Sequence, residues 1–414
     1  MLAIRSVAIH AGDSMVNTGT SHGRAGGPFQ RLGPRPLALH LSIAASSWMS
    51  AAVPLATAMA MQQGTDMGRA FCLSVDAAKE RFDRLLTGVE LYRRHPYRRI
   101  DDEPKPIYQS ARLRLFDFGA DCGERAVPVL IVPSVINRHY ILDLMPERSF
   151  VRFLAERGFR PFLVGWGGGK DRSDMPESID ACISGELDAV LGVIRLRTEE
   201  KVVVAGYCLG GLLALALACR WPKHIRGLGF LATPWDFHSG STDHATLVRL
   251  AEPWLDNVLA LSGSVPVDCL QAMFAFQSPF AVIDKFLAFA DADQSDEGAR
   301  RFVALEDWAN DGVPLPGDIA RTLFYRWYRD NETARGCWQV DGDTVAPDRI
   351  QCPTLSIIPQ KDRIVPPASA AALAEALPNS SRLTVATGHI GLMAGNNAPS
   401  AVWAPFSEWI ESLA

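Results

Sequence analysis

A cysteine set among glycines is the residue of this chain that points most directly to chemistry. Cys208 lies in the sequence Gly-Tyr-Cys-Leu-Gly-Gly, directly after the apolar run 202–205. A strand that ends in Gly-x-nucleophile-x-Gly and leads into a helix forms a sharp turn that presents the nucleophile. The flanking Gly206 and Gly210 are expected because a side chain there would clash with a neighbouring strand or helix. We therefore predict that Cys208 is a nucleophile that forms a thioester with an acyl group.

A cysteine nucleophile needs a base, and the base needs an acid that orients it. Asp362 and His389 each follow a strand-like run, at 354–358 and 382–386 respectively. Because the carboxyl ends of parallel strands meet at one edge of a sheet, both side chains should reach the edge that carries Cys208. We predict a triad in which His389 takes the proton of Cys208 and Asp362 holds the imidazole in one tautomer.

The loop after the first strong strand, 133–137, is predicted to stabilise the negative charge that develops during acyl transfer. One donor should be the backbone N–H of Leu209, next to the nucleophile, and the second should be the N–H of Val135. His139 has two interpretations, as a side chain that lines the pocket or as a structural residue. The residues assigned to the elbow and pocket are Gly206, Tyr207, Gly210, Gly211, Asn137 and Tyr140.

Each of these motifs has a structural alternative when it is taken alone. A cysteine is often a small buried apolar side chain, an aspartate often caps a turn, and a loop histidine often only makes a structural hydrogen bond. The order nucleophile, acid, histidine, with each residue at the end of a strand-like run, favours the catalytic interpretation of Cys208, Asp362 and His389.

The elements that must position these residues alternate between strand and helix from about residue 111 onward. Strand-like runs at 127–132, 160–164, 201–205 and 225–231 are separated by helical stretches. Such alternation predicts a mostly parallel central sheet flanked by helices. Together with the nucleophile turn between a strand and a helix, the pattern is typical of the α/β-hydrolase fold.

The alternation stops between residues 238 and 317, which are mostly helical and aromatic, so we predict a helical cap inserted before the last strands. The predicted parts are a disordered leader (1–35), an N-terminal helical region (36–105), the first part of the core (106–237), the cap (238–317) and the second part of the core (318–414). The almost uncharged stretch 37–61 has three interpretations: a soluble or surface-packed helix, a membrane contact, or a targeting segment.

Composition narrows the classes of function. The 414 residues are 48% hydrophobic and 21% charged, and the formal net charge is −5, which is ordinary for a globular protein with a large core. This charge gives no reason to expect a nucleic-acid partner. The eight cysteines form no Cys-x-x-Cys pair, so a reduced, cytoplasmic setting is favoured and no metal site is predicted.

Several segments resemble the polyhydroxyalkanoate synthases, most closely the short catalytic subunit of class III. The segments are 132–154, which contains Ile-Asn-Arg-His-Tyr-Ile-Leu-Asp-Leu, the turn around Cys208, and 232–237, 362–366 and 388–390. The similarity extends over roughly residues 70–413. The Ile-Asn-x-x-Tyr-Ile-Leu-Asp-Leu run together with a cysteine elbow is what makes this resemblance specific.

The resemblance implies that Cys208 accepts a 3-hydroxyacyl group from a coenzyme A thioester. His389 would then deprotonate the hydroxyl of the bound unit, which attacks the next thioester and extends a polyester. Coenzyme A would be part of substrate and product, and no separate cofactor is expected. The resemblance also implies a cytoplasmic enzyme at polyester granules, with a homo-oligomer or a partner subunit as its assembly.

Two alternatives to polymerisation stay open at this stage. In the first, the chain is a hydrolase, a thioesterase or polyester depolymerase, in which water reaches the same triad. In the second, it is an inactive paralogue bound at granules, an interpretation to which the uncharged stretch 37–61 gives some support.

Overall fold

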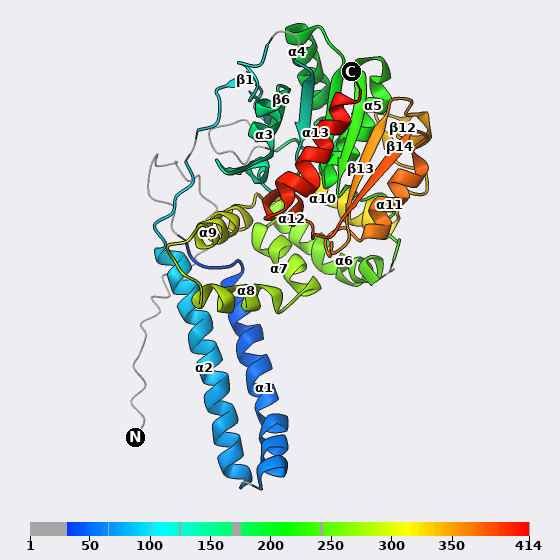
Figure 1. The fold of residues 1–414 in the computed structure, drawn as a ribbon. Helices are drawn as coiled ribbons and strands as arrows, with labels where there is room; N and C mark the ends of the chain where they lie inside the picture. Colours follow the sequence, from blue (N-terminus) through cyan, green and yellow to red (C-terminus); the bar gives the residue numbers. More distant parts are fainter. Residues whose placement is uncertain are drawn as a thin grey trace. The chain divides into compact units, whose positions relative to one another are not determined.

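The structure, a computed structural model, describes residues 31–64, 66–100, 102–123, 126–167, 175–240 and 243–413. Residues 1–30 of the predicted leader lie outside the described residues. The described part is built around a large sheet flanked by helices (Figure 1).

The central sheet has the strand order β1-β2-β6-β3-β7-β8-β13-β14. Its bounds are β1 Pro106–Gln109, β2 Leu113–Asp117, β3 Pro128–Val132, β6 Arg160–Trp166, β7 Val202–Tyr207, β8 Ile225–Leu231, β13 Thr354–Pro359 and β14 Ser380–Val385. The two pairs that involve β2 are antiparallel, and every pair from β6 to β14 is parallel. The predicted mostly parallel sheet is therefore confirmed.

The register of the sheet aligns the strand ends that matter for chemistry. Val132 at the end of β3 is paired with Gly206 near the end of β7, and Tyr207 is paired with Leu231 at the end of β8. Farther along the sheet, Pro359 of β13 is paired with Val385 of β14. The loops after β3, β7, β13 and β14 consequently start at the same edge.

Helices cover the sheet on its faces. Their bounds are α3 Phe150–Glu156, α4 Asp188–Thr198 with a wide helical turn Ala181–Leu187 before it, α5 Leu209–Arg220, α11 Pro367–Ala376, α12 Gly391–Ala394, and α13 Ala404–Glu411 after the wide turn Pro399–Trp403. Every residue of β7 is buried, as is α5 from Leu209 to Ala218. This explains why both read as continuous apolar runs rather than as alternating or amphipathic patterns.

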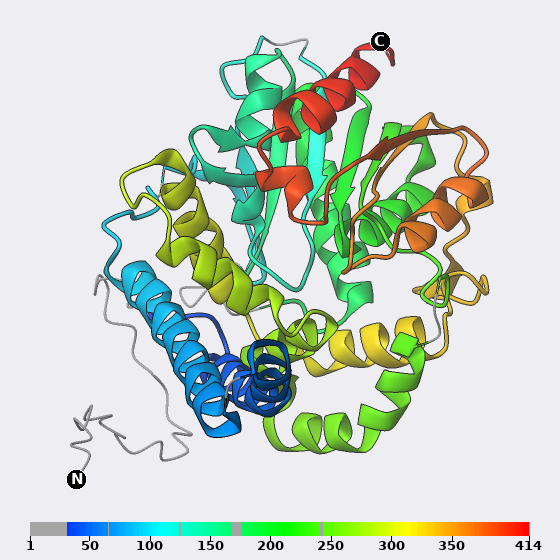
Figure 2. The same cartoon turned by 60° about the horizontal axis from the view of Figure 1, so that its bottom comes forward.

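Between β8 and β13 the chain leaves the sheet and forms a helical insertion (Figures 1 and 2). Its helices are α6 Asp243–Ser262, α7 Val267–Gln277, α8 Ala281–Ala290, α9 Glu297–Asn310 and α10 Gly317–Arg321, followed by the wide turn Thr322–Arg329. The predicted cap before the last strands is therefore confirmed. Short strand pairs lie outside the main sheet: β4 Asp143–Met145 with β5 Arg148–Ser149, β9 Ser264–Val265 with β10 Leu315–Pro316, and β11 Gln339–Val340 with β12 Asp343–Thr344.

The N-terminal helical region is a hairpin of two long helices, α1 Leu37–Gln63 and α2 Met67–Arg94 (Figure 1). It packs on the cap where Tyr92 of α2 meets Phe286 of α8, with the two ring centroids 5.8 Å apart. By length and composition alone, residues 37–62 of α1 could cross a membrane. A buried core helix or a signal sequence meets the same criteria, so the three interpretations of this stretch stay open.

Residues 31–35, at the end of the predicted leader, are attached to the cap. Arg31 is buried, and its Nε lies 2.6 Å from Oδ1 of Asp307 in α9. The guanidinium of Arg35 donates to Oδ1 of Asp268 at 2.8 Å. These residues therefore belong to the packed structure, although composition alone assigns them to a disordered leader.

Candidate active site

Cys208 lies in the sharp turn between β7 and α5. Its backbone has φ +56° and ψ −128°, a conformation that residues with a side chain rarely adopt. The N–H of Cys208 donates to the carbonyl of Leu231 at 2.9 Å, which fastens the turn to the neighbouring strand β8. The residue is 8% exposed, so the sulfur lies beneath the surface of the protein.

The glycines around Cys208 are required by close backbone approach. A Cβ on Gly206 would lie 2.3 Å from Cα of Gly211, and a Cβ on Gly210 would lie 2.1 Å from the carbonyl oxygen of Val132. Contacts this short would force the backbone apart, so the turn forms only with glycine at these positions. The contact at Gly210 also shows that the end of β3 lies against the first turn of α5.

His389 and Asp362 form a buried hydrogen-bonded pair. Nδ1 of His389 lies 2.7 Å from Oδ2 of Asp362, and each residue is 6% exposed. The other carboxylate oxygen of Asp362 accepts from the N–H groups of Ile364 at 2.8 Å and Val365 at 2.9 Å. The carboxylate is thus held in place, and with Nδ1 donating to it, Nε2 of His389 is left for the sulfur.

The electrostatics of His389 tie the pair to Cys208. Burial by itself lowers the pKa of the imidazole, but the charge of Cys208 and the hydrogen bonds to Asp362 and Cys208 outweigh burial and raise the pKa to about 10. The structure therefore brings the three predicted triad residues together. At neutral pH this arrangement favours the imidazolium form of His389.

Two tyrosines surround the triad. The Tyr207 hydroxyl donates to the carbonyl oxygen of His389 at 3.2 Å, and the two ring centroids are 5.1 Å apart. Burial and the charges of Cys208 and Asp362 raise the pKa of Tyr328, which places its ring near the triad from the cap side. Sequence reasoning did not single out Tyr328, because it belongs to no motif and lies in the insertion.

The two predicted oxyanion donors come from the start of α5 and from the loop after β3, and these two segments lie against each other. Leu209 is the first residue of α5, and the first N–H groups of a helix have no acceptor within that helix. Val135 is 1% exposed and lies in the loop after β3. The indole of Trp166 donates to the carbonyl of Pro133 at 3.1 Å and holds the start of this loop. The oxyanion roles of Leu209 and Val135 stay predictions.

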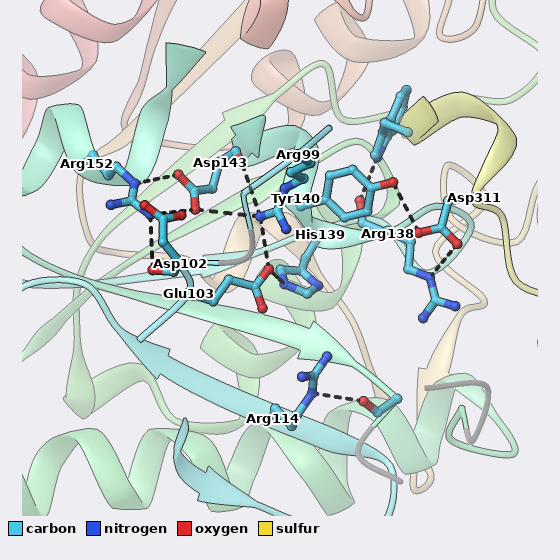
Figure 3. A network of polar contacts seen from close by, with 12 residues as sticks. Arg99, Asp102, Glu103, Arg114, Arg138, His139, Tyr140, Asp143, Arg152 and Asp311 are labelled. Atoms are coloured by element: carbon cyan, nitrogen blue, oxygen red, sulfur yellow. Dashed lines mark hydrogen bonds and ion pairs between the residues drawn. The ribbon is translucent and has the colours of Figure 1, made fainter. Parts of the chain in front are cut away.

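Three further residues of the Ile-Asn-Arg-His-Tyr run contact other parts of the chain, and Figure 3 shows two of them, His139 and Tyr140. Asn137 forms an isolated antiparallel bridge with Gly312, and the Tyr140 hydroxyl donates to Asp311 at 3.1 Å. The His139 imidazole lies 3.1 Å from Oε1 of Glu103. These contacts give His139 a structural environment, whereas the pocket roles of Asn137 and Tyr140 stay predictions.

The family described as alpha/beta hydrolase fold matches residues 128–395, which include the whole triad. The chain belongs to the α/β-hydrolase fold family. The predicted fold class is thereby confirmed. Among solved structures, this α/β-hydrolase is similar to a monoacylglycerol lipase from Paleococcus ferrophilus, with 16% identity and a TM-score of 0.45 over 73% of this chain and 99% of that one.

Curated relatives of this α/β-hydrolase are named poly(3-hydroxyalkanoate) polymerase subunit PhaC. The protein from Haloferax mediterranei is 28% identical over 73% of this chain and 62% of its own length. The protein from Allochromatium vinosum is 27% identical over 73% of this chain and 87% of its own length. The chain thus spans less than two thirds of the length of the Haloferax mediterranei relative. The resemblance to polyhydroxyalkanoate synthases is confirmed.

Proposed function

We propose that this protein, which has the α/β-hydrolase fold, is an acyltransferase of the polyhydroxyalkanoate synthase type that polymerises 3-hydroxyacyl-CoA. The observation that carries the proposal is a cysteine, not a serine, at the elbow beside the buried His389–Asp362 pair. The names of the relatives support the same substrate class. A cysteine suits this reaction, because exchange between two thioesters is nearly balanced in free energy and keeps the acyl group activated.

The first step loads the enzyme. The sulfur of Cys208 attacks the carbonyl carbon of the 3-hydroxyacyl thioester, a new carbon–sulfur bond forms, and the bond to the sulfur of coenzyme A breaks. The imidazolium of His389 can return its proton to the departing thiolate. The N–H groups of Leu209 and Val135 would stabilise the oxyanion that forms in between.

The second step extends the chain and needs His389 as a base. Once Cys208 is acylated, its negative charge is gone, and with it the leading contribution that raises the pKa of His389. Burial continues to lower that pKa, so the imidazole becomes neutral more readily and can take the proton of the 3-hydroxyl group. The hydroxyl oxygen then bonds to the carbonyl carbon of the next thioester, and coenzyme A leaves.

Burial of the triad supports transfer to a hydroxyl rather than to water. Cys208, Asp362 and His389 are each less than a tenth exposed. Restricted access of water protects the Cys208 thioester from hydrolysis, so the bound unit persists until its hydroxyl attacks the next coenzyme A thioester.

Purified protein incubated with 3-hydroxybutyryl-CoA tests the proposal through released coenzyme A and product mass. Polymer supports a synthase, whereas free 3-hydroxybutyrate as the single product would show a hydrolase. If no coenzyme A is released, even after a class III partner subunit is added, both the synthase and the hydrolase hypotheses are contradicted. The hypothesis of an inactive paralogue then remains. Cys208→Ala should abolish release, and Cys182→Ala, at a fully buried cysteine outside the triad, is the matched control.

The proposal includes a cytoplasmic location at polyester granules and assembly as a homo-oligomer or with a partner subunit. Measuring activity with and without that subunit, next to the mass of the protein in solution, separates the two forms of assembly. Fluorescent fusion to the full chain in cells that accumulate polyester tests the location.

A further inference from the structure

The loop that carries Val135 is attached to the core at one end. The indole N–H of Trp166 donates to the carbonyl of Pro133, and Gly210 of the elbow lies directly beneath the carbonyls of Val132 and Pro133. Between Pro133 and Asn137 the chain forms no helix or strand. The position of the Val135 N–H therefore depends on how the far end of this loop is held.

The far end of the loop is held by the cap, at the segment that follows α9. The carboxylate of Asp311 accepts from the Tyr140 hydroxyl at 3.1 Å, and its other oxygen lies 3.4 Å from Nε of Arg138 (Figure 3). The adjacent Gly312 forms the backbone bridge with Asn137. One turn earlier, the indole of Trp308 donates to the carbonyl of Arg138 at 2.8 Å.

The Tyr140 side of this contact is rigid. Tyr140 is 9% exposed, and the guanidinium of Arg99 lies 4.6 Å from the centroid of its ring. Burial and the charge of Asp311 raise the pKa of Tyr140, so its hydroxyl stays protonated and donates at neutral pH. A rotation of Asp311 away from Tyr140 would consequently leave a buried hydroxyl without this acceptor.

We propose that Asp311 is a positioning residue for acyl transfer: through Tyr140 and Arg138 it holds loop 134–140, and with it the Val135 oxyanion donor, in the catalytic orientation. The inference deepens the proposed function and rests on it, because it concerns the same thioester chemistry. An oxyanion donor must lie within about 3 Å of the developing charge, and a misplacement of about 1 Å costs on the order of a hundredfold in rate.

The structure offers a matched control for this contact. In the cap, Asp256 of α6 accepts from the Tyr325 hydroxyl at 2.9 Å and from Arg321 at 3.0 Å, so it repeats the same Arg–Asp–Tyr chemistry at a different place. The side chains of Asp311 and Asp256 are 37% and 50% exposed, so each substitution removes a carboxylate that is partly solvated, and both variants should fold.

The test compares Asp311→Ala, Asp311→Asn, Tyr140→Phe and Asp256→Ala in the full chain. For each variant we would measure kcat and KM for release of coenzyme A from 3-hydroxybutyryl-CoA. A second acyl donor is p-nitrophenyl butyrate, whose reaction with Cys208 needs the same oxyanion donors. The initial burst of released nitrophenol measures this acylation. Alkylation of Cys208 by iodoacetamide is the control reaction, because displacement at an sp³ carbon develops no carbonyl oxyanion.

Asp311→Ala should lower kcat about tenfold and change KM by less than about twofold, since positioning acts in the transition state. Asp311→Asn, which keeps an acceptor for Tyr140, should recover part of the loss. The double variant Tyr140→Phe, Asp311→Ala should have a kcat only slightly below that of either single variant, because both substitutions remove the same contact between Tyr140 and Asp311. Alkylation of Cys208 and the activity of Asp256→Ala should be unchanged.

An unchanged kcat in Asp311→Ala, an equal loss in Asp256→Ala, or slower alkylation of Cys208 would overturn the role of Asp311. If the natural protein releases no coenzyme A but is still acylated by the nitrophenyl ester, the synthase proposal fails and the burst alone decides on Asp311. If neither donor acylates Cys208, both proposals fail.

Discussion

Replacing Cys208 by alanine should lower the pKa of His389. The imidazole is buried, which by itself lowers its pKa, and the value of about 10 depends on the charge of Cys208 together with hydrogen bonds to Cys208 and Asp362. Alanine removes the charge and one hydrogen bond but leaves burial unchanged. The variant therefore reproduces, without substrate, the loss of charge that acylation of the sulfur would cause.

The structure sets the size of this effect. Relative to the ordinary histidine value of about 6.5, a pKa of about 10 corresponds to about 5 kcal/mol in favour of the imidazolium. The charge of Cys208 is the largest of the contributions that raise this pKa, so the pKa of His389 in the variant should fall clearly below about 10. Because the folded-state pKa is raised, the interaction stabilises the native protein fully below about pH 6.5 and is lost as pH rises towards about 10. In Cys208→Ala that loss should be complete at lower pH.

Titration of the ring nitrogens by NMR in protein labelled at histidine measures the change. The chain has nine histidines, so His389→Gln is needed to assign the resonance. Cys182→Ala should titrate like the natural protein. If His389 has the same pKa with and without the Cys208 thiol, the sulfur does not sustain the imidazolium, and the argument that acylation turns His389 into a base is refuted.

Two other substitutions probe the acid and the elbow. Asp362→Asn should lower kcat at least about a hundredfold, because the amide no longer holds His389 in the tautomer that the sulfur needs. Steady-state release of coenzyme A measures this kcat, and a value near that of the natural protein would contradict the proposed triad. Gly210→Ala should reduce the free energy of unfolding in urea by about 2 kcal/mol or more, because its Cβ would lie 2.1 Å from the carbonyl of Val132. Gly192→Ala in α4, where a Cβ meets nothing within 4 Å, should be neutral or slightly stabilising.

Much of the fold could be predicted because its signals are local. The strand-like runs before Cys208, Asp362 and His389 correspond to β7, β13 and β14, with boundaries that differ by one or two residues. The break in alternation located the insertion before the last strands. Composition did less well at residues 31–35, because Asp307, the partner of the buried Arg31, lies in the cap and leaves no mark in the sequence next to Arg31.

Among the contacts around the triad, one could be predicted from local sequence signals and another could not. The hydrogen bond between His389 and Asp362 could be anticipated, since both residues follow adjacent parallel strands of one sheet. Tyr328 could not, because it reaches the triad from the wide turn Thr322–Arg329 of the insertion, whose sequence contains no catalytic motif. A cap side chain becomes part of a site only through the docking of the insertion on the sheet.

By itself, the sequence determined which residue occupies the predicted nucleophile position, the glycines that its turn needs, and the order of the predicted acid and base along the chain. These features depend on backbone sterics and on strand–helix alternation over short distances. Only the tertiary structure decided what holds the loop that is predicted to carry the Val135 oxyanion donor. Tyr140 and Asp311 are 171 positions apart, and their hydrogen bond exists because the cap packs on the loop after β3. Packing between remote segments sets such contacts, and no local pattern of residues encodes them.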